Sequence, residues 1–146
     1  MTKTIKASGG CLCGATRFTA HTTQVHMGAC HCKMCRQWAS GPYLAVECGS
    51  DVVFENTDKL AVYESSAWAE RGFCKQCGSH LFYRFKDTNN HMMAAGTFDD
   101  ESAFILDHQV FIDNKPHYYS FAEKTHNMTE AESMAEYAST PPESKD

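Results

Sequence analysis

The stretch Cys30-His31-Cys32-Lys33-Met34-Cys35 is the part of the sequence around which the chain is organised. It places three cysteines within six consecutive residues, so that their sulfurs can converge on one metal ion. Zinc in structural sites takes four ligands, and three sulfurs leave that shell incomplete. The stretch therefore predicts an open metal site, in which one position remains for water, a substrate or a ligand from elsewhere in the chain.

Two further cysteine pairs flank this triplet. Cys11 and Cys13 lie upstream, and Cys74 and Cys77 lie downstream. Residues two apart in an extended segment point to the same side, so a CxC pair can present both sulfurs to one ion, and a CxxC pair does so with a tight turn. A glycine directly follows each pair, where the missing Cβ lets the backbone turn back toward the sulfurs. The outer pairs together predict a closed, four-cysteine structural zinc site.

Size and charge limit the classes of protein that the chain can represent. Its 146 residues, 42% of them hydrophobic, fit a single zinc-binding domain, which we expect over residues 1–140, followed by a disordered tail at 141–146. No apolar run is long enough to cross a bilayer, so we expect no membrane partner. A formal charge of −5, with no cluster of Lys and Arg, argues against nucleic acid as a partner.

The cysteine content also predicts a compartment. Residues 1–6 carry charge, but no apolar stretch follows them, so we expect no secretory signal and a cytoplasmic location. In that reducing environment, eight cysteines at CxC and CxxC spacings favour metal ligation over disulfides. An iron–sulfur cluster is an alternative metal centre, although the spacings do not match those of ferredoxins.

Several residues could complete or tune the open site. His31 lies between two ligands, and because neighbours in a strand point to opposite sides, we expect its ring to face away from the metal. His31 or His26 as a fourth ligand is the alternative. Lys33 and Arg36 could balance the negative charge of the sulfurs or hold a substrate carboxylate. Cys48 lies in a β-rich run, so we expect a small buried hydrophobic residue there rather than a ligand.

Outside the cysteine motifs, short β-rich runs bounded by turn residues predict antiparallel strands. These strands are expected at residues 15–19, 43–48, 52–54, 60–63, 81–85, 92–96 and 108–112. Near the C-terminus, Thr129-Glu130-Ala131-Glu132 matches a capping box and apolar residues follow at helical spacing. The expected fold is therefore mainly β, with a short C-terminal helix.

Three stretches together closely resemble the glutathione-dependent formaldehyde-activating enzyme family, which includes centromere protein V. They are Gly9-Gly10-Cys11-Leu12-Cys13-Gly14-Ala15, Cys30-His31-Cys32-Lys33-Met34-Cys35-Arg36 and Arg71-Gly72-Phe73-Cys74-Lys75-Gln76-Cys77-Gly78-Ser79-His80-Leu81. The resemblance runs from about Gly9 to Pro116. It implies a β-tent type fold that holds two zinc ions. Structural zinc would lie on Cys11, Cys13, Cys74 and Cys77, and catalytic zinc on Cys30, Cys32 and Cys35.

The resemblance also implies an activity. The family's named reaction joins formaldehyde to glutathione to form S-hydroxymethylglutathione, which is a carbon–sulfur lyase reaction in reverse. We therefore expect small-molecule partners, a thiol and a small carbonyl, with the thiol taking the open position of the three-cysteine site. No catalytic residue beyond the zinc ligands Cys30, Cys32 and Cys35 is expected, since the thiol itself is the nucleophile. A non-catalytic binding module, in which zinc serves only to hold the fold, is the second hypothesis.

Overall fold

The computed structural model describes residues 4–139, so the tail predicted at 141–146 lies outside the described residues. Strands account for most of the regular structure, as predicted, and a helix ends the described chain. The elements in chain order are β1 (Thr4–Gly10), β2 (Arg17–Gln24), β3 (His26–Cys30), α1 (Lys33–Ala39), β4 (Tyr43–Gly49), β5 (Val52–Glu55), η1 (Thr57–Lys59), β6 (Leu60–Tyr63), β7 (Ala69–Cys74), β8 (His80–Phe85), β9 (His91–Ala94), η2 (Ala95–Thr97), β10 (Ile105–Val110), η3 (Ile112–Asn114), β11 (His126–Asn127) and α2 (Glu130–Ser139).

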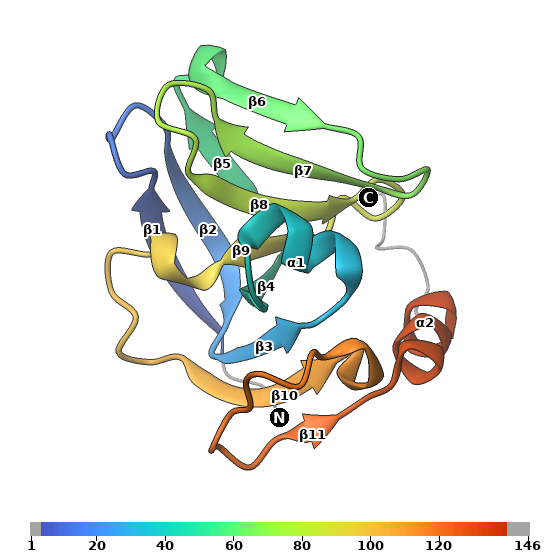
Figure 1. Ribbon diagram of the computed structural model, residues 1–146. Coiled ribbons are helices and arrows are strands. Elements are labelled where there is room, and N and C mark those ends of the chain that lie inside the picture. The colour runs from blue at the N-terminus through green and yellow to red at the C-terminus, as the bar shows by residue number, and fades with distance from the viewer. Residues whose placement is uncertain (1–3, 140–146) are drawn as a thin grey trace.

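The strands form two sheets. The larger has eight strands in the order β11-β10-β3-β4-β9-β8-β7-β6, and the smaller has the order β1-β2-β5. Figure 1 shows the larger sheet curving from β6 to β11, with α1 lying over it. Most neighbouring strands are antiparallel, as predicted, but β10 pairs in parallel with both β3 and β11. The run-and-turn pattern does not predict these two pairings, because they join segments that are distant in the chain.

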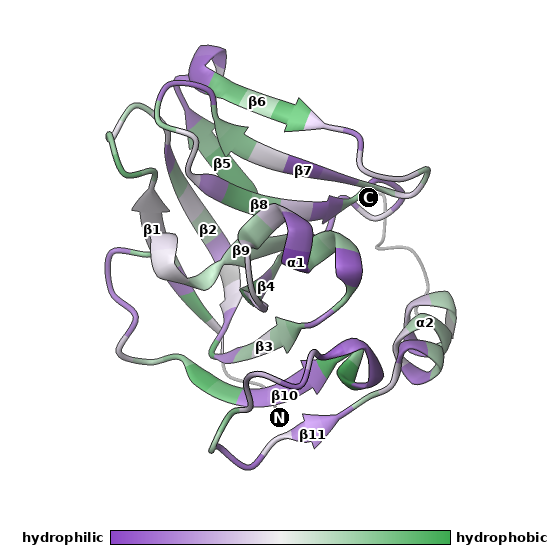
Figure 2. Cartoon of the chain, in the orientation of Figure 1, coloured by the Kyte–Doolittle hydropathy of each residue, from purple (hydrophilic) through white to green (hydrophobic). Residues whose placement is uncertain are grey.

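The main core fills the space between the two sheets. Phe18 of β2 is 1% exposed and meets Phe98 edge-on, with ring centroids 5.2 Å apart. Phe54 of β5 reaches Phe82 of β8, at 5.4 Å between centroids. Burying an aromatic side chain of this kind stabilises a fold by roughly 1.5–3 kcal/mol. Figure 2 shows hydrophobic residues along β3, β5 and β6, whereas β11 at the outer edge is hydrophilic.

Most of the predicted strands are confirmed. The runs at 43–48, 52–54, 60–63 and 81–85 coincide with β4, β5, β6 and β8 to within one residue. The run predicted at 15–19 corresponds to β2, which covers Arg17–Gln24. The run predicted at 108–112 corresponds to β10, which covers Ile105–Val110. Strands β1, β3 and β7 and helix α1 were not predicted, because their sequences mix polar residues, glycines and cysteines without a clear period.

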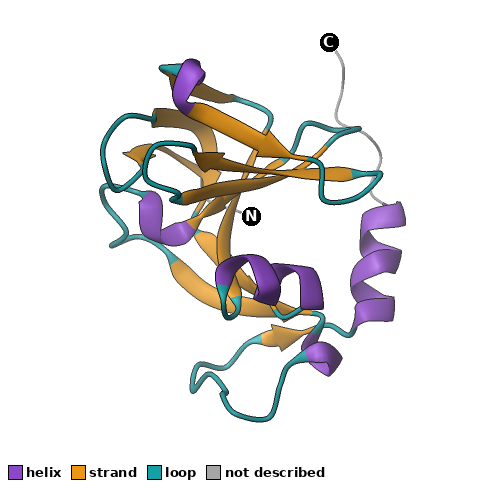
Figure 3. Ribbon diagram, turned by 45° about the horizontal axis from the view of Figure 1, so that its top comes forward, coloured by secondary structure: helices purple, strands orange, loops and turns teal. Residues whose placement is uncertain are grey.

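The predicted capping box is confirmed at the start of α2. The Thr129 amide donates to Glu132 Oε1 at 2.9 Å, and the Glu132 amide donates to Thr129 Oγ1 at 3.2 Å. These two bonds satisfy backbone groups that a helix start leaves without partners. Figure 3 shows α2 and α1 on the same side of the larger sheet. Neither of these helices, nor any other in residues 4–139, has the length and apolar character needed to span a membrane.

Candidate functional site

The outer cysteine pairs form one compact cluster. Cys11 and Cys13 follow β1, Cys74 ends β7, and Cys77 lies in the turn before β8. Their four sulfurs all lie within 4.8 Å of one another, with Cys11–Cys13 at 3.6 Å and Cys13–Cys74 at 3.8 Å. Tetrahedral zinc with Zn–S bonds of about 2.3 Å requires sulfurs about 3.8 Å apart. The geometry and the all-thiol donor set therefore fit a four-coordinate zinc ion.

Two matching turns aim these sulfurs. Gly14 and Gly78 both have φ of +81°, in the left-handed region that favours glycine. The Gly14 amide donates to the Cys11 carbonyl at 3.1 Å, and the Gly78 amide donates to the Cys74 carbonyl at 2.7 Å. Each glycine thus closes a tight turn around its pair, as the sequence predicts. A side chain at either position would impose the steric cost of left-handed backbone, roughly 1–2 kcal/mol.

Ser79 links the two halves of the outer cluster. Its hydroxyl accepts a hydrogen bond from the Leu12 amide at 2.9 Å and lies 3.2 Å from Cys77 Sγ. The hydrogen bond with this hydroxyl lowers the pKa of Cys77 to about 5, which favours the thiolate form that metal ligands require. A residue outside the cysteine pattern therefore helps to prepare the cluster.

The central triplet forms a second cluster. Cys30 ends β3, Cys32 is the N-cap of α1, and Cys35 lies in the first turn of that helix. The three sulfurs lie within 4.8 Å of one another, and the Cys35 amide donates to Cys32 Sγ at 3.3 Å. The pKa of Cys32 is lowered, mostly by its hydrogen bond with Cys30 and next by its hydrogen bond with Cys35. The same bond between Cys30 and Cys32 raises the pKa of Cys30. The cluster thus favours at least one thiolate, and its three sulfurs fit a zinc ion with one position left for another ligand.

The strand order fixes Cys30 from both sides. β3 lies between β4 and β10, and Cys30 pairs with Tyr43 on one side and with Val110 on the other. The Tyr43 hydroxyl donates to the Met92 carbonyl at 2.6 Å, and burial raises its pKa well above the usual value. This phenol therefore stays neutral and acts as a wall beside the sulfurs rather than as an acid or base.

His31 faces away from the triplet, as predicted. Its ring is fully buried, with Nδ1 2.8 Å from the Tyr119 hydroxyl and Nε2 2.7 Å from Gln109 Oε1. Because that amide oxygen only accepts, Nε2 carries the proton and Nδ1 accepts from the phenol. Burial lowers the pKa of His31, which keeps the ring neutral. His31 therefore attaches the segment after β10 to the back of the cysteine motif.

His26 and Cys48 lie apart from both cysteine clusters. His26 is at the opposite end of β3 from Cys30, with Nδ1 2.5 Å from Asp107 Oδ2, so its ring pairs with a carboxylate and does not complete the triplet. Cys48 is fully buried, and its thiol donates to the Val46 carbonyl at 3.4 Å. The expectation of a packing role for Cys48 is thus confirmed.

Arg71 is the cation that contacts the triplet. The sequence suggested Lys33 and Arg36 for this role, but Arg36 Nε donates to the His31 carbonyl at 2.8 Å. Arg71 is 3% exposed, and its Nη1 donates to Cys35 Sγ at 3.6 Å. Its guanidinium carbon lies 4.6 Å from the centre of the Tyr83 ring. A buried positive charge at this position offsets the negative charge of the thiolates.

Arg71 also stacks on Trp38, with its guanidinium carbon 5.1 Å from that ring's centre, and Trp38 in turn stacks on His80 at 4.1 Å. Arg71 Nε has no hydrogen-bond partner within residues 4–139. Aromatic faces thus hold the guanidinium in place of carboxylates, which leaves its charge directed at the sulfurs.

Replacing Arg71 with methionine should weaken metal binding at the triplet alone. The loss of the neighbouring positive charge is expected to lower the affinity for the zinc ion that the triplet would hold about 10–100-fold, as for other residues that support metal ligands. Competition with a chromophoric chelator measures this affinity. Lys86→Met is the matched control, because Lys86 pairs with Glu64 at 3.4 Å and does not line the cavity at the triplet. Equal zinc affinity in the Arg71 and Lys86 variants would contradict the role given to Arg71.

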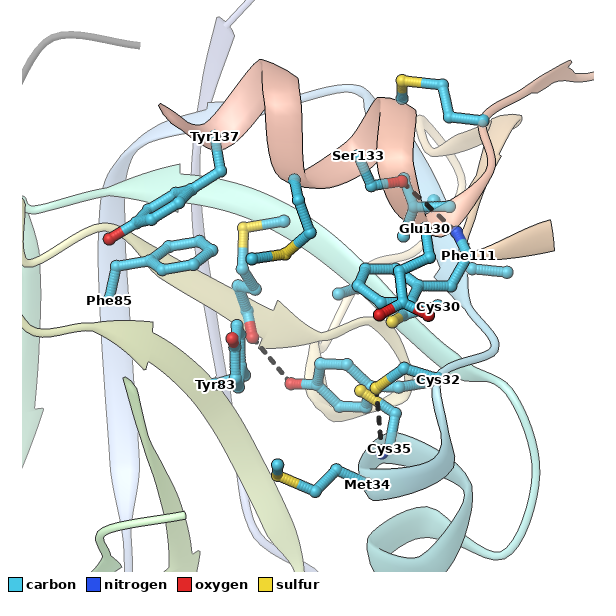
Figure 4. A pocket seen from close by; sticks show the side chains of 18 of the residues that line it. Cys30, Cys32, Met34, Cys35, Tyr83, Phe85, Phe111, Glu130, Ser133 and Tyr137 are labelled. Atoms are coloured by element: carbon cyan, nitrogen blue, oxygen red, sulfur yellow. Dashed lines mark hydrogen bonds between the residues drawn. The ribbon is translucent and has the colours of Figure 1, made fainter. Parts of the chain in front are cut away.

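A cavity of about 580 Å³ opens over the three sulfurs of the triplet. Residues of α1 and α2 both line it, together with residues of the larger sheet. Figure 4 shows the three cysteines at one side of this cavity and α2 crossing it, with Tyr137 over Phe85 and Ser133 near Phe111. The triplet thus lies at the wall of a pocket large enough for an organic molecule.

A family model described as glutathione-dependent formaldehyde-activating enzyme matches residues 6–114, which include both cysteine clusters. The chain belongs to this family. An uncharacterised lyase of Schizosaccharomyces pombe is 36% identical over 127 residues, which cover 86% of this chain and 93% of that protein. A Podospora anserina protein whose provisional name is glutathione-dependent formaldehyde-activating enzyme is 35% identical over 81 residues, covering 52% of this chain and 38% of that protein.

The fold agrees with a solved structure. A crystal structure of a Rhodobacter sphaeroides protein superposes with a TM-score of 0.55 at 19% identity, covering 63% of this chain and 87% of that one. The match to the formaldehyde-activating enzyme family model ends with η3. The segment that carries β11 and α2 follows the matched part of the chain.

Apart from His31, the residues around the triplet that are not cysteines could not be placed from the sequence. Arg71 stands next to Gly72 in a segment without strand periodicity, and its approach to Cys35 depends on the pairing of β7 with β8. Helix α2 was predicted, but its position over the triplet was not. The capping box and the apolar residues at helical spacing gave a signal for the helix, but no residue pattern indicated which surface it would cover.

Proposed function

We propose that this family member is a zinc-dependent lyase-like enzyme that adds a thiol to formaldehyde or another small carbonyl at the triplet. The carbon–sulfur bond forms as the carbonyl double bond opens, and the proton lost by the thiol ends on the carbonyl oxygen. No nucleophile from the protein is needed, so the reaction requires only that two small molecules meet in the correct ionisation states. The observation that supports this proposal most directly is the open three-sulfur cluster in the wall of a cavity of about 580 Å³.

Cys30, Cys32 and Cys35 would hold the zinc. When bound, zinc supplies a Lewis-acidic position that favours the deprotonated form of a thiol and polarises a carbonyl. Arg71 offsets the negative charge that three thiolates bring into a buried place. Tyr43 and Tyr83 wall the site, and burial raises the pKa of both phenols, so neither supplies a competing anion. Cys11, Cys13, Cys74 and Cys77 would hold a second zinc with a purely structural role.

NMR exchange between formaldehyde and its thiol adduct tests this function. With zinc-loaded protein and a panel of thiols that includes glutathione, at least one thiol should exchange faster than in buffer. The Cys48→Ala variant is the control, since it removes a buried cysteine that belongs to neither cluster. If no thiol exchanges faster than in buffer, the enzymatic proposal is rejected in favour of a binding module that uses zinc only for its fold.

A further inference from the structure

The cavity over the triplet has mainly apolar walls. Phe85 of β8 and Tyr137 of α2 stack with centroids 4.6 Å apart and an interplanar angle of 21°. Tyr83 and Phe111 line the same cavity, and so do methionines from both the sheet and α2, among them Met92 and Met134. Aromatic rings and methionines recognise apolar groups, because they offer large contact surfaces and adaptable packing. The body of a ligand in this cavity would therefore meet rings and thioethers.

The charges that line the cavity do not favour an anion. Three carboxylates lie along it, those of Glu47, Glu130 and Glu136. Against them stand two cations, Lys33 and Arg71, and Arg71 already faces Cys35. Of the two cations that line the cavity, only Lys33 has a charge that is not directed at the sulfurs. Glutathione has two carboxylates against one ammonium group, so its net negative charge would have to approach this surplus of negative charge.

Helix α2 forms one wall of the cavity and is attached to the rest of the protein at both of its ends. At its start, the Glu130 amide donates to Asp113 Oδ1 at 2.8 Å and Ser133 Oγ accepts from the Phe111 amide at 3.3 Å. Near its end, the Tyr137 hydroxyl donates to Asp87 Oδ2 at 3.0 Å, beyond the stack on Phe85. These contacts hold the helix between η3 and the turn that joins β8 to β9. Figure 4 shows the bond between Phe111 and Ser133 at one end and Tyr137 beside Phe85 at the other. The helix lies beyond residues 6–114, so it adds a wall to the part that the family model matches.

We propose that the thiol substrate has an uncharged aromatic body, as in a phenylalkyl thiol, which packs against Tyr137, Phe85 and Met134 while its sulfur faces the triplet. This inference rests on the proposed function for its sulfur chemistry, but it concerns recognition. The aromatic ring would displace water from the apolar wall and stack beside Tyr137. This thiol would react with formaldehyde as in the proposed function. The carbon–sulfur bond forms as the carbonyl double bond opens, and the thiol proton ends on the carbonyl oxygen.

Isothermal titration of zinc-loaded protein, without formaldehyde, compares 2-phenylethanethiol with glutathione. We expect 2-phenylethanethiol to bind about ten-fold tighter or more, because it buries a ring that glutathione lacks. Tyr137→Ala should weaken 2-phenylethanethiol about ten-fold and change glutathione binding little. Ala131→Ser, at an exposed position of α2 that does not line the cavity, is the matched control. Circular dichroism and zinc content confirm that each variant keeps its fold.

A charge variant separates recognition from a merely structural effect of α2. Met134→Lys places a cation on the cavity wall and should weaken 2-phenylethanethiol while tightening glutathione about two- to three-fold, the range of a partly screened charge. Loss of the helix alone would not move the two ligands in opposite directions. Glutathione binding as tightly as 2-phenylethanethiol, or no binding of either, overturns the inference. Preferred binding of 2-phenylethanethiol, with no thiol exchanging formaldehyde faster than in buffer, supports the apolar recognition and instead rejects the proposed function.

Discussion

Replacing Cys74 with serine is expected to unfold the protein or make it aggregate. Cys74 is fully buried at the end of β7, and its sulfur lies 3.8 Å from that of Cys13, which is 61 residues earlier in the chain. A zinc ion held by the outer cluster would fasten the β1–β2 connection to the β7–β8 turn. Structural zinc can contribute on the order of 10 kcal/mol to folding, because the site is not formed in the unfolded chain. Since a domain is stable by only about 5–15 kcal/mol, losing this ion would remove most of the stability.

Thermal unfolding and zinc content, measured on the same preparations, check this prediction. Cys48→Ala is the matched control, because it also removes a fully buried sulfur but lies outside both clusters. It should cost only a small cavity, about 1–2 kcal/mol, and leave the zinc content unchanged. A soluble Cys74→Ser protein with the melting temperature of the parent would show that the outer cluster does not hold the fold together.

Only some parts of the fold have a local cause in the sequence. The runs that became β4, β5, β6 and β8 combine β-branched or aromatic residues with clear turn signals, so both the type and the limits of each strand could be predicted. Strand β3 was not predicted and the limits of β10 were displaced, because neighbouring strands hold both of them more than their own residues do. Their parallel pairing aligns Val110 with Cys30 across 80 residues of chain, and no local pattern encodes such a contact.

The same distinction applies to the site. The cysteine spacings predict both clusters, because each ligand pair is a local feature with a fixed reach. The orientation of His31 also follows from its immediate neighbours. By contrast, the approach of Arg71 to Cys35 and the position of Tyr137 over Phe85 depend on how distant strands and α2 pack. The two cysteine clusters were therefore predictable from the sequence, whereas the residues that would select a substrate required the fold.

Replacing Cys32 with serine should remove zinc from the triplet and abolish the proposed exchange while leaving the fold intact. Cys32 is the N-cap of α1, and its sulfur accepts a hydrogen bond from the Cys35 amide at 3.3 Å. Serine is among the preferred N-cap residues, so its hydroxyl can take over this bond and keep the helix in place. Serine is nevertheless a poor zinc ligand, because its hydroxyl does not ionise as a thiol does. The substitution therefore separates the metal-binding role of the residue from its structural role.

Zinc content should fall from two ions per chain to one, and exchange of formaldehyde with the preferred thiol should slow about a hundred-fold or more, since a metal supplies several kcal/mol of charge stabilisation. The melting temperature should stay far closer to that of the parent than in Cys74→Ser, because the outer cluster is untouched. Cys48→Ala again serves as the control for losing one buried thiol. Retention of two zinc ions with undiminished exchange would place the chemistry elsewhere, whereas loss of both ions would mean that the two clusters do not act independently.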